Sequence, residues 1–195
     1  MDNPGEIAGY IGTPLTSNAT KVLLLGSGEL GKQLAMSFQN LGLEVHAVDS
    51  YAGAPAHQVA QFSYVADIKD TGRILQLAQE IQPHFVVPEV ETVAVEALEE
   101  MEAHSDAIVV PSARACAMTQ DRQCVREVAE NIGLPVSAYR FASSVEELEE
   151  AVGELGFPCI IKPDVSTSGK GHMIARDEED VRTAWETVRR VSSDS

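Results

Sequence analysis

KVLLLGSGELG, residues 21–31, is the stretch from which the fold of this chain is predicted. Residues 21–25 form an apolar run typical of a buried strand. Gly26, Gly28 and Gly31 follow with the G-x-G-x-x-G spacing of a strand-to-helix turn whose backbone N–H groups bind phosphate. A tight turn in any α/β protein produces the same spacing, so the motif predicts the local structure better than it predicts a ligand.

Outward from this turn, apolar runs of strand length alternate with amphipathic helical patterns. Predicted strands lie at 21–26, 44–48, 62–65, 84–87 and 107–110, and predicted helices at 30–40, 74–81 and 94–101. Such alternation is typical of parallel sheets, and right-handed crossovers place helices on both faces. We therefore expect an α/β fold that starts with an open, parallel, Rossmann-like sheet over residues 21–118, after a lead-in segment over residues 1–20.

The pattern changes after Pro111. Helices are predicted at 125–132, 145–155 and 177–188, and strands at 138–141, 158–162 and 172–175. The run Ser144-Val145-Glu146-Glu147 has the capping-box pattern that starts a helix, and Asp177 is the predicted cap of the last helix. Residues 119–195 are therefore expected to form a second, small α+β subdomain.

Composition excludes several classes of function. The formal charge of −16 argues against nucleic-acid binding, because such a surface repels phosphate backbones. No apolar run approaches the roughly 18 residues that cross a bilayer, and no secretory signal is recognisable, so we expect no membrane partner. Cysteines and histidines are scattered without metal-ligand spacing, so no metal ligand is assigned. Three cysteines without a secretion signal predict reduced thiols and a cytoplasmic protein.

Acidic residues follow several of the predicted strands. Glu29 lies inside the glycine turn, where a carboxylate repels a phosphate but favours an amine or hydroxyl groups. Glu89 and Glu91 follow another strand, and the loops after parallel strands meet at the carboxyl edge where open α/β sheets bind ligands. We expect Glu29 and Glu89 to face one substrate that carries an amino group. Two alternatives stay open: a solvated helix start for Glu89, and a dinucleotide whose ribose Asp49 contacts.

A second candidate site follows the strand that begins at Pro158. Lys162 ends this apolar strand, so its charge requires a partner or an escape to water. The loop 166–171, STSGKG, offers backbone N–H groups and Lys170 to phosphate oxygens. It does not match the Walker A pattern, and an exposed Gly/Ser hairpin is the alternative. The strand–lysine–loop–strand order favours a nucleotide site.

The ordered set of motifs resembles the ATP-grasp carboxylate–amine ligases, and among them the formate-dependent phosphoribosylglycinamide formyltransferase family. The motifs that carry the resemblance are GSGELGK from Gly26, PEVE from Pro88, Asp121-Arg122, YRFA from Tyr139, and Lys162 with its STSGKG loop. The resemblance runs from about Gly12 to the last helix. It implies that residues 21–118 are a pre-ATP-grasp substrate domain and residues 119–195 the first ATP-grasp subdomain.

The resemblance also implies a reaction and its residues. ATP, with Mg²⁺, phosphorylates formate to formyl phosphate, which the amine of glycinamide ribonucleotide attacks during purine biosynthesis. Substrate contacts are implied for Glu29, Leu30 and Glu89. ATP contacts are implied for Arg122, Lys162, Thr167, Ser168, Gly169, Lys170, Gly171 and His172. No catalytic residue is assigned within this chain, and the family implies a homodimer.

Two departures from the family pattern limit these expectations. The chain stops where the family's large C-terminal ATP-grasp subdomain, with its Mg²⁺ ligands, is expected to begin, so we expect this piece alone to be inactive. Asp121 stands where the family suggests asparagine, and an ion pair with Arg122 is expected. The alternatives are another ATP-grasp carboxylate–amine ligase, a non-catalytic nucleotide-binding module, and a nicotinamide-binding Rossmann module.

Overall fold

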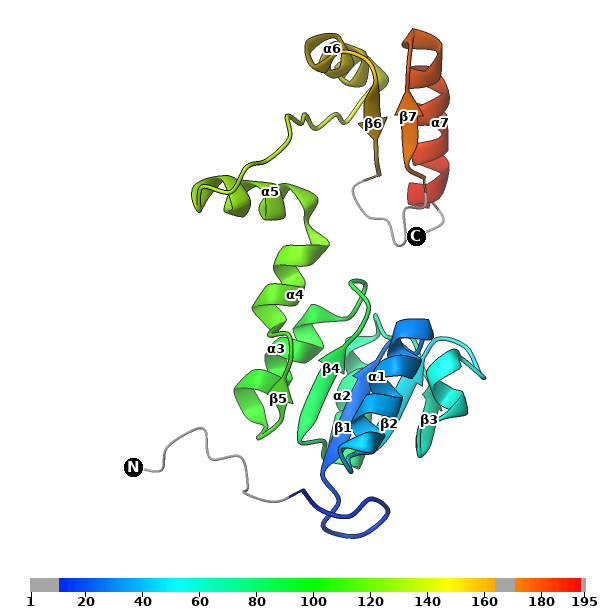
Figure 1. Cartoon of the computed structure of the whole chain (residues 1–195), viewed down its shortest axis with the longest axis vertical. Helices are drawn as coiled ribbons and strands as arrows, with labels where there is room; N and C mark the ends of the chain where they lie inside the picture. Colours follow the sequence, from blue (N-terminus) through cyan, green and yellow to red (C-terminus); the bar gives the residue numbers. More distant parts are fainter. Residues whose placement is uncertain (1–10, 164–170, 194–195) are drawn as a thin grey trace. The chain divides into compact units, whose positions relative to one another are not determined.

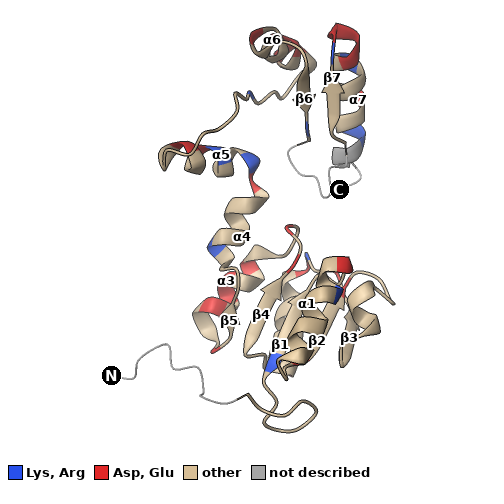
Figure 2. Cartoon of the chain, in the orientation of Figure 1, with Lys and Arg blue, Asp and Glu red and all other residues tan. Residues whose placement is uncertain are grey.

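The structure is a computed structural model that describes residues 11–163 and 171–193. It falls into two compact units, residues 1–117 and 118–195, which we call unit 1 and unit 2 (Figure 1). In the described part of the chain, no helix is long and apolar enough to cross a membrane. Acidic residues lie along α3 (Val95–His104) and at the start of α7 (Glu178–Ser193), as the red parts of the ribbon in Figure 2 show.

Unit 1 contains the parallel sheet that the sequence predicts. Its described strands, in sheet order, are β3 (Phe62–Val65), β2 (Glu44–Asp49), β1 (Lys21–Leu25), β4 (Phe85–Pro88) and β5 (Ile108–Val109). All adjacent strands in this sheet run parallel, which confirms the predicted α/β class (Figure 1). The chain starts at β1, moves outward to β3 and returns to β4 on the other side. The order therefore reverses between β1 and β4, and open sheets bind ligands at the carboxyl ends of such a strand pair.

Helices cover both faces of this sheet because β1 buries side chains on both sides. Leu23 and Leu25 pack in the cluster formed with α2 (Thr71–Ile81) and α3, whereas Leu24 packs in the cluster formed with α1 (Glu29–Asn40). A strand buried on both faces reads as a continuous apolar run, so the prediction from residues 21–25 holds.

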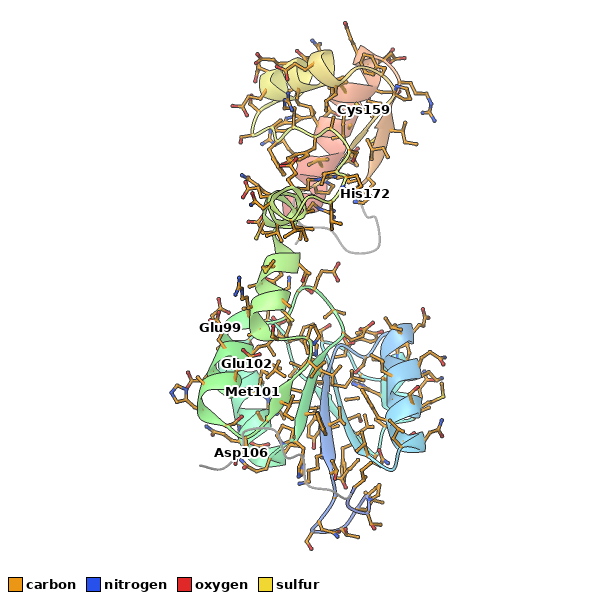
Figure 3. The ribbon with its side chains drawn as sticks, turned by 60° about the vertical axis from the view of Figure 1, so that its left-hand side comes forward. Glu99, Met101, Glu102, Asp106, Cys159 and His172 are labelled. Atoms are coloured by element: carbon orange, nitrogen blue, oxygen red, sulfur yellow. The ribbon has the colours of Figure 1, made fainter. Side chains whose placement is uncertain are left out.

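Two further elements of the chain were not predicted. A 3-10 turn, η1 (Pro55–Gln58), follows β2, and α4 (Ala113–Gln120) follows β5. Glu102, on α3, accepts a hydrogen bond from the Ala113 backbone N–H at 2.9 Å and so fixes the start of α4 (Figure 3). The alanine-rich sequence of α4 has little apolar periodicity, which explains why the pattern did not reveal it.

Unit 2 is a small α+β unit, as predicted. Its described elements are α5 (Arg122–Asn131), α6 (Val145–Leu155), β6 (Cys159–Ile161), β7 (Met173–Ala175) and α7. β6 and β7 pair antiparallel, and residues of α6 and α7 form a core with them, which includes Val152, Ile161 and Val181. Ser144 and Asp177 cap α6 and α7 as predicted, by accepting bonds from the N–H groups of Glu147 and Asp180.

The predicted strand at 138–141 is wrong. The described residues there have no strand partner, and polar contacts hold them instead. The Tyr139 ring lies 4.8 Å below the Arg126 guanidinium carbon, and the Tyr139 hydroxyl donates to Glu130 at 3.2 Å. Arg140 forms an ion pair with Glu154 at 2.7 Å. An alternating local pattern does not supply the neighbouring strand that a sheet requires.

Candidate functional site

The glycine turn after β1 is tied to the end of β2. The Gly26 N–H donates to the Val48 carbonyl at 3.0 Å, and Gly26 has φ +100°, which favours glycine. The Ser27 N–H donates to Asp49 Oδ2 at 2.8 Å, and the Ser50 N–H donates to Asp49 Oδ1 at 2.7 Å. Asp49 therefore holds this loop region together, which accounts for its position without a ribose ligand.

Glu89 lies directly against this turn. Its backbone N–H donates to the Leu25 carbonyl at 2.8 Å, which places Glu89 at the carboxyl end of β4 beside β1. A Cβ atom built at Gly26 would be 2.8 Å from Glu89 Oε2, and one built at Gly28 would be 4.0 Å away. The carboxylate thus occupies the space that the glycines leave, at the point where the strand order reverses.

One oxygen of this carboxylate has an unused hydrogen-bonding capacity. Glu89 Oε2 is buried and accepts no hydrogen bond from any described residue. Burial raises the pKa of Glu89, and the charges of Asp49 and Glu91 raise it further. Buried polar atoms are nearly always paired, so this oxygen indicates a ligand or solvent donor at the edge of the sheet. A cationic or hydrogen-bond-donating group meets both requirements.

Replacing Glu89 by glutamine is expected to raise the melting temperature of the chain at pH 7.5. A carboxyl group with a raised pKa binds its proton more tightly in the folded state, so it contributes stability at low pH that is lost as the pH rises above its unfolded pKa. The advantage of the variant should therefore shrink towards pH 4.5. Calorimetry at both pH values measures it, with exposed Glu99→Gln as the control. An unchanged or lower melting temperature for Glu89→Gln at pH 7.5 would contradict the stated environment.

Glu29 and Leu30 lie in the first turn of α1, directly after Gly28, the N-cap residue. Both side chains are exposed, Leu30 at 61%. α1 follows β1, so both residues stand at the carboxyl edge of the sheet, as predicted from the sequence. The structure thus brings the carboxylate of Glu89 to the glycine turn and leaves Glu29 and Leu30 open to solvent on the adjoining helix.

Lys162 and His172 lie at one end of the β6–β7 hairpin in unit 2. Lys162 directly follows β6 and His172 directly precedes β7, and Ile161 and Met173 are the last paired residues between them. Burial lowers the pKa of His172, and the charges of Lys162 and Arg122 lower it further, so both cations act electrostatically on this histidine. Of the other predicted ATP contacts, Gly171 is described, and Thr167, Ser168, Gly169 and Lys170 lie outside the described residues.

An exposed apolar pair on the same hairpin was not predicted. Ile160 and Ile174 are directly opposite each other in register and are 59% and 48% exposed. Side chains alternate along a strand, so Ile160 shares its face with Lys162, whereas Ile161 points into the core. The signal available in the sequence was that successive side chains of a strand over residues 159–162 point to opposite faces, so one of the two adjacent isoleucines faces away from the core. An apolar surface beside cations suits a ligand with a flat base and a polyphosphate.

Asp121 has a structural role that was not predicted. Its Oδ1 atom accepts hydrogen bonds from the N–H groups of Gln123 at 2.8 Å and Cys124 at 3.1 Å, so it is the N-cap of α5. The cap fixes Arg122 as the first residue of this helix. The expected ion pair between Asp121 and Arg122 stays a prediction. Within the described ranges, no group of His, Cys, Asp or Glu side chains is arranged to hold a metal ion.

Comparison with known families agrees with both units. Residues 19–120 match the model of the ribonucleotide synthetase preATP-grasp domain, and residues 127–193 match the model of the ATP-grasp domain. The chain belongs to the ribonucleotide synthetase family defined by this preATP-grasp domain, followed here by ATP-grasp sequence.

Individual relatives of this chain carry a more specific name than the family models do. Formate-dependent phosphoribosylglycinamide formyltransferase of Corynebacterium glutamicum (strain R) is 51% identical over 177 residues, which are 90% of this chain and 43% of that relative. The enzyme of the same name from Methylococcus capsulatus is 51% identical over 180 residues, 92% of this chain and 45% of the relative. The chain thus spans less than half the length of these curated relatives.

Solved structures show the same fold. The glycinamide-RNase-transformylase T from Mycobacterium tuberculosis superposes with a TM-score of 0.68 and 36% identity, over 80% of this chain and 43% of that structure. An ADP complex of N5-carboxyaminoimidazole ribonucleotide synthetase superposes with a TM-score of 0.77 and 30% identity, over 91% of this chain and 45% of that structure.

Proposed function

We propose that this chain supplies the substrate edge and part of the ATP site of an enzyme that formylates glycinamide ribonucleotide, with ATP and formate, through formyl phosphate in purine biosynthesis. The observation that carries the proposal is the buried, unpartnered Oε2 atom of Glu89 at the glycine turn, where the strand order reverses. The formyltransferase names of the relatives support the substrate and the reaction.

Each unit carries its own proposed binding site. In unit 1, Glu29, Leu30 and Glu89 bind glycinamide ribonucleotide, and Glu89 accepts a hydrogen bond from a donor of this ligand. In unit 2, Arg122 and Lys162 offset the negative charge of the triphosphate, His172 contacts it through a ring N–H group, and the segment from Thr167 to Gly171 adds backbone donors. The exposed faces of Ile160 and Ile174 receive the adenine ring.

Phosphoryl transfer depends on positioning and on a metal ion that neutralises developing charge, so the proposed reaction uses Mg²⁺. None of the described residues is arranged to ligate it, and we assign its ligands to the part of the longer relatives that this chain does not span. The division into a substrate domain, residues 21–118, and an ATP-grasp subdomain, residues 119–195, belongs to the same proposal. So do a cytoplasmic location and a homodimer.

A second candidate function is that of a carboxyaminoimidazole ribonucleotide synthetase. Its support is the TM-score of 0.77 to such an enzyme in complex with ADP. The higher identity to formyltransferases, 51% against 30%, favours the first candidate. Both candidates bind ATP in unit 2 and a ribonucleotide in unit 1. The identity of the ribonucleotide that unit 1 binds therefore distinguishes them.

NMR titration of the ¹⁵N-labelled chain with ATP and then with glycinamide ribonucleotide tests the proposal. ATP is expected to shift backbone signals around Lys162 and His172, and the ribonucleotide those around Gly26 and Glu89. Lys162→Met should weaken ATP binding about tenfold or more, because a charge-assisted contact to phosphate is lost, whereas Lys69→Met, in unit 1, should not. ATP shifts at the glycine turn, or saturable NADH binding, would instead support a dinucleotide module.

A further inference from the structure

A buried polar cluster lies in unit 1 at the opposite edge of the sheet from the glycine turn. Glu44, the first residue of β2, and His46 are 4% and 5% exposed. The His46 Nε2 atom lies 2.9 Å from Glu44 Oε1, and its Nδ1 atom lies 3.0 Å from the Tyr64 hydroxyl. The His46 ring stacks on Phe62 with 4.6 Å between ring centroids.

A neutral imidazole satisfies every polar atom of this cluster. In that state Nε2–H donates to Glu44, and Nδ1 accepts from the Tyr64 hydroxyl. A second proton on His46 would make both ring nitrogens donors, and the Tyr64 hydroxyl would have to turn and accept. The added charge would also be buried, away from water. The cluster therefore favours the neutral histidine.

Glu44 connects this cluster to the segment before β1. Its Oε2 atom accepts a hydrogen bond from the Leu15 N–H at 2.6 Å, and Leu15 has the unusual φ of +64°. The Glu44 N–H donates to the Thr20 carbonyl at 2.9 Å, and the Gly12 N–H donates to Thr20 Oγ1 at 3.0 Å. A single carboxylate thus binds both His46 and the segment 12–20.

We propose that Glu44, His46 and Tyr64 form an acid-sensitive latch that holds residues 12–20 on the amino edge of the sheet and releases them when His46 is protonated. When the segment is released, water can reach the imidazolium. In the closed cluster the His46 ring is buried, so a charged ring is disfavoured there. The proposal is independent of the ligand sites at the carboxyl edge.

Burial favours the neutral histidine, and the surrounding charged groups act in both directions. Burial lowers the pKa of His46, the hydrogen bond and charge of Glu44 oppose this shift, and the charge of Lys21, on β1, adds to it. Burial raises the pKa of Glu44, but the bonds from His46 and Leu15, with the charge of Lys21, lower it overall. Burial and the charges of Glu80, on α2, and Glu44 raise the pKa of Tyr64. On the β4 side, exposed His84 accepts from the Lys21 N–H.

The sign of the pH effect follows from these directions. A histidine whose pKa is lowered in the closed state takes up its proton when the latch opens, so closure is fully favoured above the ordinary pKa of about 6.5 and is lost as the pH falls. Glu44 adds a second loss below its ordinary pKa of about 4.3, because protonation removes the acceptor for Leu15. The first effect of acidification is therefore assigned to His46.

Hydrogen exchange followed by mass spectrometry tests the latch in the full chain. After correction for intrinsic rates, protection of residues 12–20 is expected to fall by up to about fivefold between pH 6.5 and 5.5, because the opened histidine, with its ordinary pKa of about 6.5, is already half protonated at the upper pH. His46→Gln keeps a donor for Glu44 and an acceptor for Tyr64 but does not titrate, so its protection should stay constant. The matched control His84→Gln should behave as the wild type.

A wild-type segment with equal protection at both pH values would overturn the proposal, as would the same fall in His46→Gln. NMR titration of the His46 ring in the wild-type chain provides a measurement that needs no folded variant. A pKa below 6.5 is expected, and a value at or above 6.5 would contradict the latch.

Discussion

Leu23→Ala is expected to lower the free energy of unfolding of unit 1 by about 2–5 kcal/mol, the usual cost of removing a fully buried leucine side chain. Leu23 is the central residue of β1, has no exposed surface and lies opposite His46 on one side and Val86 on the other. The neighbouring strands are fixed by their backbone ladders, so they cannot close the cavity that alanine leaves.

The two units allow a specific measurement of this effect. Trp185, the one tryptophan of the sequence, packs against the core of unit 2, so its fluorescence follows that unit. Urea unfolding monitored by the NMR signals of unit 1 should shift to lower urea, while the Trp185 transition stays in place. The control is Leu41→Ala, because Leu41 is 62% exposed and its loss should change stability by less than about 0.5 kcal/mol. Equal effects of the two substitutions would contradict the assigned core.

The sheet of unit 1 was predictable because its signal is local. Residues 22–25 are buried, on both faces of the sheet, so they stand out as a continuous apolar run followed by a glycine turn. The strand at 62–65 was predicted although β3 is an exposed edge, since aromatic and β-branched residues mark it. The wrong and the missing predictions arise where the local sequence pattern does not match the structure. The segment 138–141 resembles a strand but has no neighbour, and α4 is a helix without a periodic apolar face.

The candidate site was predictable only in outline. The rule that ligands bind at the carboxyl ends of parallel strands was enough to bring Glu29 and Glu89 to one edge of the sheet. The unpartnered Oε2 atom of Glu89 requires the position of β4 beside β1, which no local pattern contains. The contact between His46 and Tyr64 likewise depends on the register of β2 with β3. Pairing between strands far apart in the sequence therefore determines which polar groups meet, and composition and motif spacing do not predict it.

Gly26→Ala is expected to damage both the stability of unit 1 and its substrate edge. The backbone at Gly26 has φ +100°, where a side chain costs about 1–2 kcal/mol. In addition, the new Cβ atom would lie 2.8 Å from Glu89 Oε2 and 3.0 Å from a methyl group of Val90. The Glu89 side chain is the part that can turn away, so the substitution should displace the carboxylate that we propose to meet the substrate.

Two other glycines of unit 1 separate these effects. Gly53 has φ +75° and no atom within 4 Å of a built Cβ, so Gly53→Ala should show the backbone cost alone and keep ribonucleotide binding. Gly28 has φ −67°, and a Cβ there would be 4.0 Å from Glu89 Oε2, so Gly28→Ala should cost less than about 1 kcal/mol as a weakened N-cap. Urea unfolding and NMR titration with glycinamide ribonucleotide measure both properties in all three variants. If Gly26→Ala matched Gly53→Ala in both stability and ribonucleotide binding, the contact between the glycine turn and Glu89 would have no role in the site. A loss of binding confined to Gly26→Ala would show that the turn positions Glu89 by leaving room for its carboxylate.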